Sequence, residues 1–409
     1  MSTRVVVLTQ WLEPRTSLPS RIVEALATHG MDVEVVTGPP FDISSNQVAP
    51  GHKWWRSSEE RLDGVPVHRY PFYPGHSTAS WERLLLYGSF ASSTSARALR
   101  HLRRADVVLV YATPATAAMA AMTARRLHGT PYVLMVQDVW PDSIFASGFM
   151  TGRVRSVAEG ATQRFVNASY EMASRITAHS PGMRRLLMSR GVPGDKIHVI
   201  YNWADEQALH DVVSVPERAP GEPLHVLYAG NLGPPQGLDV VLRTLARFGK
   251  DEVRLSLAGH GIAEPELRGI AEGMPDADIR FLGQLTPEDL LRVQHSAHLN
   301  LISLRDDPLF LITLPSKTQT LMCVGAPILA FAPGEVAQIV TDAGCGIAAT
   351  AGDSESLEAS LRRAMQWPDE AFADCGKAAR SYYETHMSAA INTPRLVDAL
   401  QRAASEGRR

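Results

Sequence analysis

A glycine-containing stretch in the second half of the chain has the residues and spacing to bind an anion. The sequence YAGNLGPPQGLD occupies residues 228–239 and includes Gly230, Gly233 and Gly237. Glycine lets backbone amides approach a ligand closely, and the helix predicted to follow presents the positive end of its dipole, which suits a diphosphate. The spacing differs from GxGxxG and does not indicate a nicotinamide cofactor. A tight turn without a ligand is the alternative interpretation.

A second stretch of the same half has the same physical properties. The sequence DDPLFLITLPSK, residues 306–317, leads from a predicted strand into a predicted helix. Pro315 fits the start of that helix, Ser316 can cap it, and Lys317 adds a mobile positive charge beside free amides. A plain capped helix with a solvated lysine is the alternative. Both stretches follow strands, and open parallel sheets bind ligands at the carboxyl ends of their strands, so the two together favour a binding site.

The elements that must position these residues follow one pattern in both halves of the chain. Short apolar runs rich in β-branched residues alternate with helical segments, which predicts parallel sheets. Strands are expected at residues 5–8, 32–37, 106–111, 132–136, 175–178 and 197–200, and again at 224–229, 253–258, 279–282, 299–303, 328–331 and 346–349. Pro, Gly and charged residues dominate between the two sets. The predicted fold class is α/β with two tandem Rossmann-like domains. They comprise residues 1–204, a linker at 205–222, residues 223–385, and a C-terminal helix at 386–409 that packs back on the first domain.

Composition excludes several classes of protein. The 409 residues are 45% hydrophobic and 20% charged, with a net charge of −3, so we expect no attraction to nucleic acid. The three cysteines, Cys323, Cys345 and Cys375, lack metal-ligand spacing, which argues against a zinc site or a disulfide framework. Neither a secretory signal nor an apolar run of transmembrane length is evident. We therefore expect a cytoplasmic protein, with contact at the inner face of the membrane left open.

Beyond these two stretches, a series of segments resembles one enzyme family. AGNLGPPQGLD, LAGHG, IRFLGQLTPEDL, LPSKTQTLMCVGAPILA and DAGCGI occur in the order seen in family 4 retaining glycosyltransferases, and MVQDVWPDS and HVIYNWADE extend the match upstream. The chain looks most like the branch of bacterial fucosaminyltransferases and colanic acid or O-antigen sugar transferases. The resemblance implies the GT-B fold, with the two domains facing a central cleft. It also implies transfer of a sugar from a nucleoside diphosphate sugar, UDP-linked, to a hydroxyl of a glycan, a lipid-linked sugar or a natural product.

The resemblance also implies a donor site, with departures from the family pattern. The family's Arg and Lys correspond to Asn231 and Gln236, whose amides still donate hydrogen bonds. The family's pair of glutamates corresponds to Ile312 and Thr320. Lys317 and the loop amides are then left to hold the diphosphate. The implied donor-binding residues are Gly230, Asn231, Leu232, Gly233, Gln236, Gly261, Leu282, Leu314, Ser316, Lys317 and Thr320, with Asp306, Asp307 and Glu335 as candidates for contact with the sugar.

The first domain is implied to bind the acceptor. Where the family often has a His-Asp pair, this chain has Gln137 and Asp138. Asp138 is a catalytic candidate that contacts the donor sugar or the acceptor hydroxyl, or else a loop-capping residue beside Trp140. The family's Gly-Gly loop is replaced by TQWLEPRTS at residues 9–17. The catalytic candidates are Asp138 and Lys317, and the acceptor-binding candidates are Arg15, Ser17, Gln137 and Asn202.

Aromatic and basic residues mix in three stretches of the first domain, at 52–56 (HKWWR), 70–73 and 81–87. Such a surface can lie on a membrane or grip a lipid-linked or aromatic acceptor. Local core with a solvated rim is the alternative.

A retaining transferase of this kind needs no strong external base, because the departing diphosphate accepts the acceptor's proton. No Asp-x-Asp pair is evident, so we expect neither a metal nor another cofactor. A sugar-nucleotide epimerase or hydrolase on the same fold is an alternative that requires a carboxylate or histidine base. A catalytically inactive partner subunit is another, suggested by the departures at Asn231, Gln236, Ile312 and Thr320.

Overall fold

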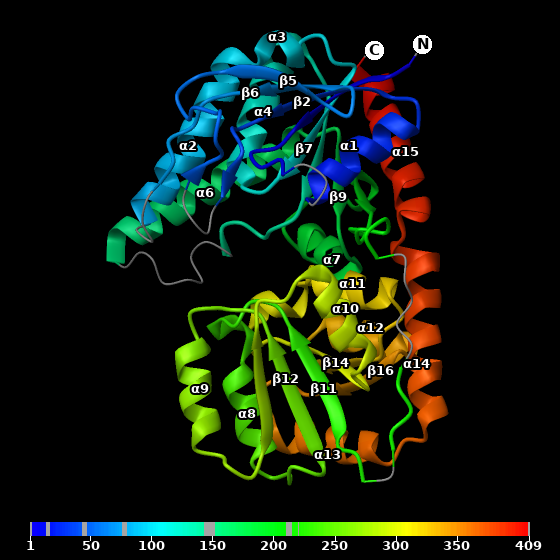
Figure 1. Ribbon diagram of the computed structural model, residues 1–409. Helices are drawn as coiled ribbons and strands as arrows, with labels where there is room; N and C mark the ends of the chain where they lie inside the picture. The colour runs from blue at the N-terminus through cyan, green and yellow to red at the C-terminus, as the bar shows by residue number, and fades with distance from the viewer. Residues whose placement is uncertain are drawn as a thin grey trace. The chain divides into compact units, whose positions relative to one another are not determined.

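The chain forms two compact units, each built on its own parallel sheet. The computed structural model describes residues 2–13, 17–42, 47–75, 80–142, 152–209, 215–219 and 221–407. The first unit comprises Met1–Tyr201 together with Ala389–Arg409, and the second comprises Asn202–Ser388 (Figure 1). The second unit is therefore inserted, in sequence, into the first.

The sheet of the first unit has strand order β10-β9-β8-β7-β1-β2-β6-β5, and every neighbouring pair is parallel except β5 with β6. Its strands are β1 (Arg4–Leu8), β2 (Asp32–Thr37), β5 (Ser58–Leu62), β6 (Val65–Arg69), β7 (Val107–Ala112), β8 (Tyr132–Val136), β9 (Arg175–Ala178) and β10 (Ile197–Val199), with β3 (Phe41–Asp42) and β4 (Gln47–Val48) as a separate antiparallel pair. The central strands are apolar throughout because helices cover both faces of the sheet.

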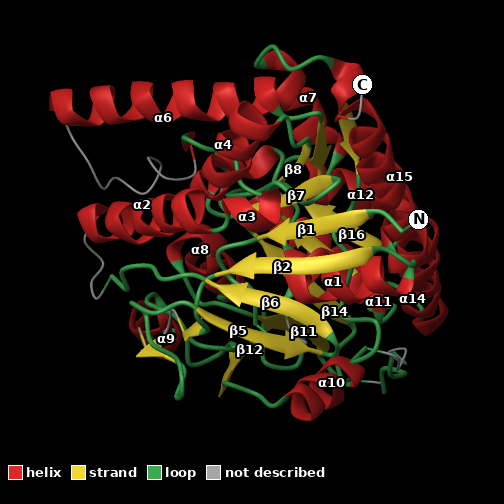
Figure 2. Ribbon diagram, turned by 90° about the horizontal axis from the view of Figure 1, so that it is seen from above, coloured by secondary structure: helices red, strands yellow, loops and turns green. Residues whose placement is uncertain are grey.

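The helices of the first unit are α1 (Leu18–Thr28), α2 (Ser80–Arg97), α3 (Leu99–Leu102), α4 (Ala118–His128), α6 (Gly152–Met172), α7 (Pro181–Ser189) and α15 (Ala389–Gly407), with short 3₁₀ turns η1 (Ala115–Ala117) and η2 (Gly194–Lys196). In Figure 2, α4 lies between α2 and α6, and it packs against both. The C-terminal helix α15 packs against β7, β8, β9 and α1. The last residues of the chain thus complete the core of the first unit.

The sheet of the second unit has strand order β13-β12-β11-β14-β15-β16 and is parallel throughout. Its strands are β11 (Leu224–Ala229), β12 (Val253–Ala258), β13 (Asp278–Gly283), β14 (Leu299–Ser303), β15 (Ile328–Phe331) and β16 (Gly346–Ala349). Its helices are η3 (Pro234–Gln236), α8 (Leu238–Leu245), α9 (Glu264–Glu272), α10 (Pro287–His295), η4 (Pro308–Leu311), α11 (Ser316–Cys323), α12 (Glu335–Ala343), α13 (Ser354–Met365), α14 (Asp369–Tyr382) and the π-helical turn η5 (Tyr383–Met387). Both sheets confirm the predicted α/β class with two Rossmann-like units.

The strand order of the second unit locates the edge at which a ligand is expected. From β11 the chain proceeds outward to β12 and β13, and it then returns to place β14 on the other side of β11. The order therefore reverses between β11 and β14, and ligands of open α/β sheets bind at the carboxyl ends of strands at such a reversal. The loops that follow β11 and β14 are the two stretches that the sequence singled out.

Candidate active site in the second unit

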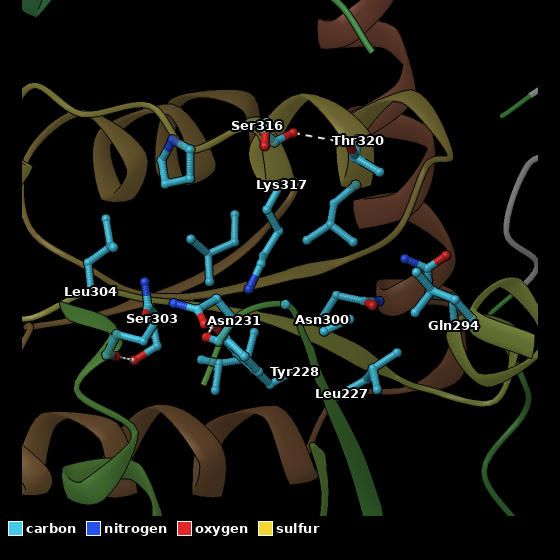
Figure 3. Close-up of a pocket in the computed structure, with 18 residues that line it drawn as sticks. Leu227, Tyr228, Asn231, Gln294, Asn300, Ser303, Leu304, Ser316, Lys317 and Thr320 are labelled. Carbon is cyan, nitrogen blue, oxygen red and sulfur yellow. Dashed lines mark hydrogen bonds between the residues drawn. The ribbon is translucent and has the colours of Figure 1, made fainter. Parts of the chain in front are cut away.

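A cavity of about 350 Å³ opens where β11 and β14 meet α10 and α11 (Figure 3). Its walls come from the ends of the two strands and from the facing sides of the two helices. The lining residues are Leu227, Tyr228, Ala229, Gly230, Asn231, Gln236, Leu290, Gln294, Asn300, Leu301, Ile302, Ser303, Leu304, Pro315, Ser316, Lys317, Thr320 and Leu321. The cavity thus joins the two anion-binding stretches that the sequence predicts.

Lys317 lies in the first turn of α11 and reaches across the cavity toward β11 (Figure 3). Its Nζ atom is 3.5 Å from the centroid of the Tyr228 ring. It also lies so close to Gly230 that a Cβ atom there would be 3.1 Å from it. Burial lowers the pKa of Lys317 to about 7, and no residue in the part of the chain that the structure describes forms an ion pair with it. An anion beside this lysine and the start of α11 would restore its charge.

The loop after β11 is held in shape by its own polar groups. The Tyr228 hydroxyl donates to the carbonyl oxygen of Asn231 at 2.8 Å. The Gly233 amide donates to Oε1 of Gln236 at 3.1 Å. Gln236 therefore uses its carbonyl oxygen to brace the loop, and only its amide nitrogen is left to donate to a ligand. Asn231 lines the cavity beside Lys317 (Figure 3).

The glycines of the LAGHG segment support this loop from behind. Gly259 has a φ of +122°, and a Cβ atom there would lie 2.0 Å from the carbonyl oxygen of Gly230. A Cβ atom on Gly261 would lie 2.2 Å from the carbonyl oxygen of Leu232. The loops after β11 and β12 therefore pack backbone against backbone, which only glycine permits. Gly261 supports the site but does not line the cavity.

The structure separates the predicted donor-binding residues into two groups. Gly230, Asn231, Gln236, Ser316, Lys317 and Thr320 line the cavity, whereas Leu232, Gly233, Gly261, Leu282 and Leu314 do not. Leu232 is buried in the core, its amide donates to the carbonyl of His260, and its carbonyl accepts from Ala263. Leu282 packs beside the core residues Leu227, Ala258 and Ala297. These leucines shape the unit through packing, as apolar side chains beside a polar site usually do.

The start of α11 differs from the prediction in one detail. Pro315 occupies the N-cap position, where it offers no capping side chain, and Ser316 is the first helical residue. The prediction that Ser316 caps this helix is therefore wrong, because the helix starts one residue earlier. The Thr320 hydroxyl donates to the carbonyl oxygen of Ser316 at 3.1 Å.

Among the candidates for sugar contact, Asp307 caps η4 by accepting from the Leu309 amide at 2.8 Å.

Arg305, which the sequence did not single out, ties the two loops together. It follows β14, and its Nε donates to the carbonyl oxygen of Pro234 at 2.6 Å. Its guanidinium also pairs with Asp239 at 3.0 Å, at the start of α8. The Ser303 hydroxyl adds a bond to the carbonyl oxygen of Gln236 at 2.6 Å. A polar residue after β14 becomes a candidate only once β14 is known to lie beside β11.

The inner end of the cavity carries two amide side chains that the sequence analysis also missed. Asn300 on β14 is 2% exposed, and its Nδ2 has no hydrogen-bond partner among the residues that are described. Gln294 on α10 is 4% exposed, and both side chains line the cavity (Figure 3). Neither belongs to a motif, so only the three-dimensional arrangement identifies them.

The predicted residues of the first unit lie at or near the carboxyl edge of its own sheet. Asp138, after β8, accepts a hydrogen bond from the Thr113 hydroxyl at 3.1 Å. Loss of hydration raises the pKa of Asp138, and this hydrogen bond partly offsets the rise. Gln137 is half-buried beside it. His179 follows β9, and burial lowers its pKa to about 4, so it is neutral near pH 7.

The structure treats the other acceptor-binding candidates, Ser17, Arg15 and Asn202, in three different ways. Ser17 stands at the N-cap of α1 without capping it, and its hydroxyl donates to the carbonyl oxygen of Glu13 at 2.9 Å. Arg15 lies outside the described residues. Asn202 was predicted for the first domain, but it belongs to the second unit, because the chain changes units after Tyr201.

The mixed aromatic and basic stretch divides between core and surface. Phe72 is buried and packs edge-on against Trp11 and Phe41. Trp54 and Trp55 are 38% and 57% exposed, and Lys53 lies 5.6 Å from the Trp55 ring. Within the described ranges, no helix is both long and apolar enough to cross a bilayer.

Comparisons with known proteins agree with this architecture. Residues 19–203 match the model of the glycosyl transferase 4-like domain, and residues 223–366 match that of glycosyl transferases group 1. The chain is 25% identical over 363 residues to the putative colanic acid biosynthesis glycosyl transferase WcaI of Escherichia coli, covering 85% of this chain and 87% of that protein.

Solved structures share the fold across the whole chain. HepE of Anabaena, solved with UDP and glucose, matches with a TM-score of 0.67 at 14% identity, covering 98% of this chain and 99% of that one. Sucrose-phosphate synthase of Thermosynechococcus elongatus matches with a TM-score of 0.71 at 13% identity, covering 99% and 100%. Two Rossmann-like units, matched in order by the two glycosyltransferase models, identify this chain as a member of the family 4 glycosyltransferases of the GT-B fold.

Proposed function

We propose that the protein is a retaining glycosyltransferase that uses a UDP-linked hexose or N-acetylhexosamine as donor and binds the donor in the cavity of the second unit. The observation that carries the proposal is the isolated ammonium of Lys317, which lies at the start of α11 and beside the backbone of Gly230. A diphosphate supplies the negative charge that this position lacks. The HepE structures were solved with UDP, with UDP-glucose, or with UDP and glucose, which supports a uridine nucleotide.

The reaction would proceed on one face of the donor sugar. The bond between the anomeric carbon and the diphosphate oxygen breaks, and the acceptor oxygen forms a new bond on the same face. The acceptor's proton passes to the departing diphosphate oxygen, so no separate base is required. Lys317, the Asn231 amide and the backbone near Gly230 stabilise the charge that develops on the leaving group. We propose that no metal is needed at this site.

The acceptor is proposed to be a hydroxyl of a growing glycan, in line with the colanic acid relative. Asp138 and Gln137 follow β8 of the first unit and are the proposed contacts for the transferred sugar or the acceptor hydroxyl. If the glycan is lipid-linked, the exposed Trp54 and Trp55 beside Lys53 would contact the inner face of the membrane.

Replacing Lys317 by alanine tests the donor site. With a radiolabelled UDP-sugar, we expect the Lys317→Ala variant to lose about 10²- to 10³-fold in transfer rate, as when one charge-stabilising donor is removed. Lys377→Ala is the matched control, because Lys377 is an exposed lysine that pairs with Asp374 on α14. Equal rates for the wild type and Lys317→Ala would disprove the diphosphate assignment.

The same preparation tests the stereochemistry. The anomeric configuration of the product, read by NMR, should equal that of the donor sugar. An inverted product would exclude the retaining mechanism, and release of free sugar without transfer would favour a hydrolase.

A further inference from the structure

A cluster of two histidines and a glutamate lies in the first unit, apart from the residues assigned to donor and acceptor. Glu34 belongs to β2, His68 to β6 and His101 to α3. Parallel pairing places His68 opposite Val36, so the side chains of Glu34 and His68 leave the same face of the sheet. One nitrogen from each ring and one carboxylate oxygen all lie within 4.8 Å of one another.

The donor atoms of this cluster face each other in a sheltered position. His101 Nδ1 is 3.3 Å from Glu34 Oε2, and His68 Nε2 is 3.9 Å from the same oxygen. The three side chains are only 12% to 13% exposed. His68 Nδ1 is buried without an ordinary hydrogen bond and lies 3.4 Å from Glu59 Oε1. Such a poorly satisfied buried imidazole calls for an explanation.

The side chains around the cluster direct carboxylate oxygens at the two imidazoles. Arg4 binds the other oxygen of Glu34, Oε1, and so leaves Oε2 directed at the histidines. Glu59 pairs with Arg100 at 2.8 Å. Oε2 of Glu34 and the carboxylate of Glu59 therefore both face the imidazole rings.

We propose that Glu34, His68 and His101 form a zinc-binding site that links β2, β6 and α3. Ligands at about 2.0–2.1 Å from a tetrahedral zinc ion are separated from each other by about 3.3 Å. The distance from Glu34 to His101 matches this value, whereas the distance from Glu34 to His68 is longer. The centroids of the two imidazole rings also lie 3.8 Å apart, so one ring would turn when the metal binds. Glu59 lies behind His68 Nδ1, where a carboxylate commonly orients a zinc-bound imidazole. Water would complete the fourth position. The Arg100 Nε donates to His101 Nε2 at 2.9 Å, and this exposed side chain would turn away when His101 Nδ1 binds the metal.

Zinc titration of the full-length protein tests the proposal. After treatment with a chelator and dialysis, isothermal titration calorimetry with Zn²⁺ should show one site per chain. His68→Gln and His101→Gln should each weaken binding at least about tenfold, the lower end of the effect of altering a metal site's supporting residues. His128→Gln, which alters an exposed histidine at the end of α4, should bind like the wild type. Absence of a stoichiometric site, or unchanged binding by both cluster variants, would overturn the proposal.

Two further measurements do not depend on the variants being folded. Co²⁺ bound to the wild type should give the intense visible absorption of a tetrahedral site, and a weak octahedral spectrum would contradict the assignment. Zn²⁺ should protect His68 and His101, but not His128, from diethyl pyrocarbonate. If zinc leaves the labelling of His68 and His101 unchanged, the proposal is also refuted. Lys317→Ala should bind zinc like the wild type. The zinc titration and the glycosyltransferase assay therefore test the two proposals independently.

Discussion

Lys317 is the residue on which the proposed donor site depends. Its ammonium has an aromatic ring below it and no acidic partner among the residues described, and burial lowers its pKa to about 7. The sequence could predict this residue because LPSK follows a strand and opens a helix. The sequence could not predict that Leu232 and Leu282 face the core, since the side-chain direction of a loop or edge residue depends on tertiary packing. Asn300 lies within a strand and matches no motif, so it also escaped notice.

Donor affinity should depend on pH through Lys317. The free protein loses this proton as the pH rises through about 7, whereas a bound diphosphate keeps the lysine charged. Binding therefore takes up a proton above pH 7, and the affinity for UDP-glucose should fall between pH 7 and 9 by up to about tenfold per unit. Calorimetry in buffers of different ionisation enthalpy measures this uptake directly. Lys317→Arg is the control, because arginine stays charged and should abolish this dependence; a slope that persists in that variant would assign it to another group.

At the scale of elements, the site depends on how closely the loops of the second sheet approach each other. The alternation of strands and helices predicted this sheet and its edge. The bracing of the loop after β11 by Arg305 was not predictable, because it requires β14 to lie beside β11, and strand order is not encoded in local pattern. The resemblance marked LAGHG, but it did not reveal that Gly259 and Gly261 pack against the backbone of the loop after β11.

Adding a methyl group at this contact should disturb the site. Gly261→Ala places a Cβ atom against the carbonyl of Leu232, so we expect a loss of about 1–3 kcal/mol in the free energy of unfolding and weaker binding of UDP. Gly269→Ala is the control, because this glycine lies within α9 with open space around its Cβ position. It should stabilise the protein by about 0.5–1 kcal/mol. Thermal and urea unfolding distinguish the two, and similar stabilities would argue against backbone packing between the loops.

The brace from β14 can be tested separately. Arg305→Ala removes the bond to the Pro234 carbonyl and the pair with Asp239, so the loop after β11 should lose its preferred shape. We expect UDP-glucose affinity to fall by about tenfold, or about 1.4 kcal/mol, with little change in the unfolding midpoint. Arg292→Ala removes a comparable exposed ion pair on α10, with Asp289, and should leave the affinity unchanged. Equal affinity in both variants would show that the loop holds its shape without Arg305.

At the scale of the whole molecule, each half of the chain forms its own parallel sheet, as the repeated pattern predicts. The boundary between the units differs from the boundary predicted from the sequence, since Asn202 belongs to the second unit. The metal-ligating residues of the first unit were not predictable, because Glu34, His68 and His101 come from three separate elements with no common spacing. The exposed tryptophans concern the molecule as a whole, because the proposed membrane contact would be made through them.

Membrane contact should depend on the surface at Trp54 and Trp55. The double variant Trp54→Ser and Trp55→Ser should bind vesicles of anionic lipid less than the wild type in a flotation assay, because amphipathic aromatic rings anchor at bilayer surfaces. Leu127→Ser, which removes another exposed apolar side chain at 62% exposure, is the control and should bind as the wild type does. Vesicle binding that the double variant retains in full would assign the contact to a different surface.

The packing of α15 determines the order in which the protein can be completed during synthesis. This helix follows the second unit in the chain and so leaves the ribosome after it, yet it covers β7, β8 and β9, which are made before the second unit. The second unit, by contrast, is a continuous segment of chain. We therefore expect that the second unit can fold as soon as residue 388 has left the ribosome, while the first remains unfinished until residue 389 and beyond have emerged. A nascent chain of residues 1–388, followed by an unstructured linker long enough to fill the exit tunnel, should consequently resist protease in its second unit only.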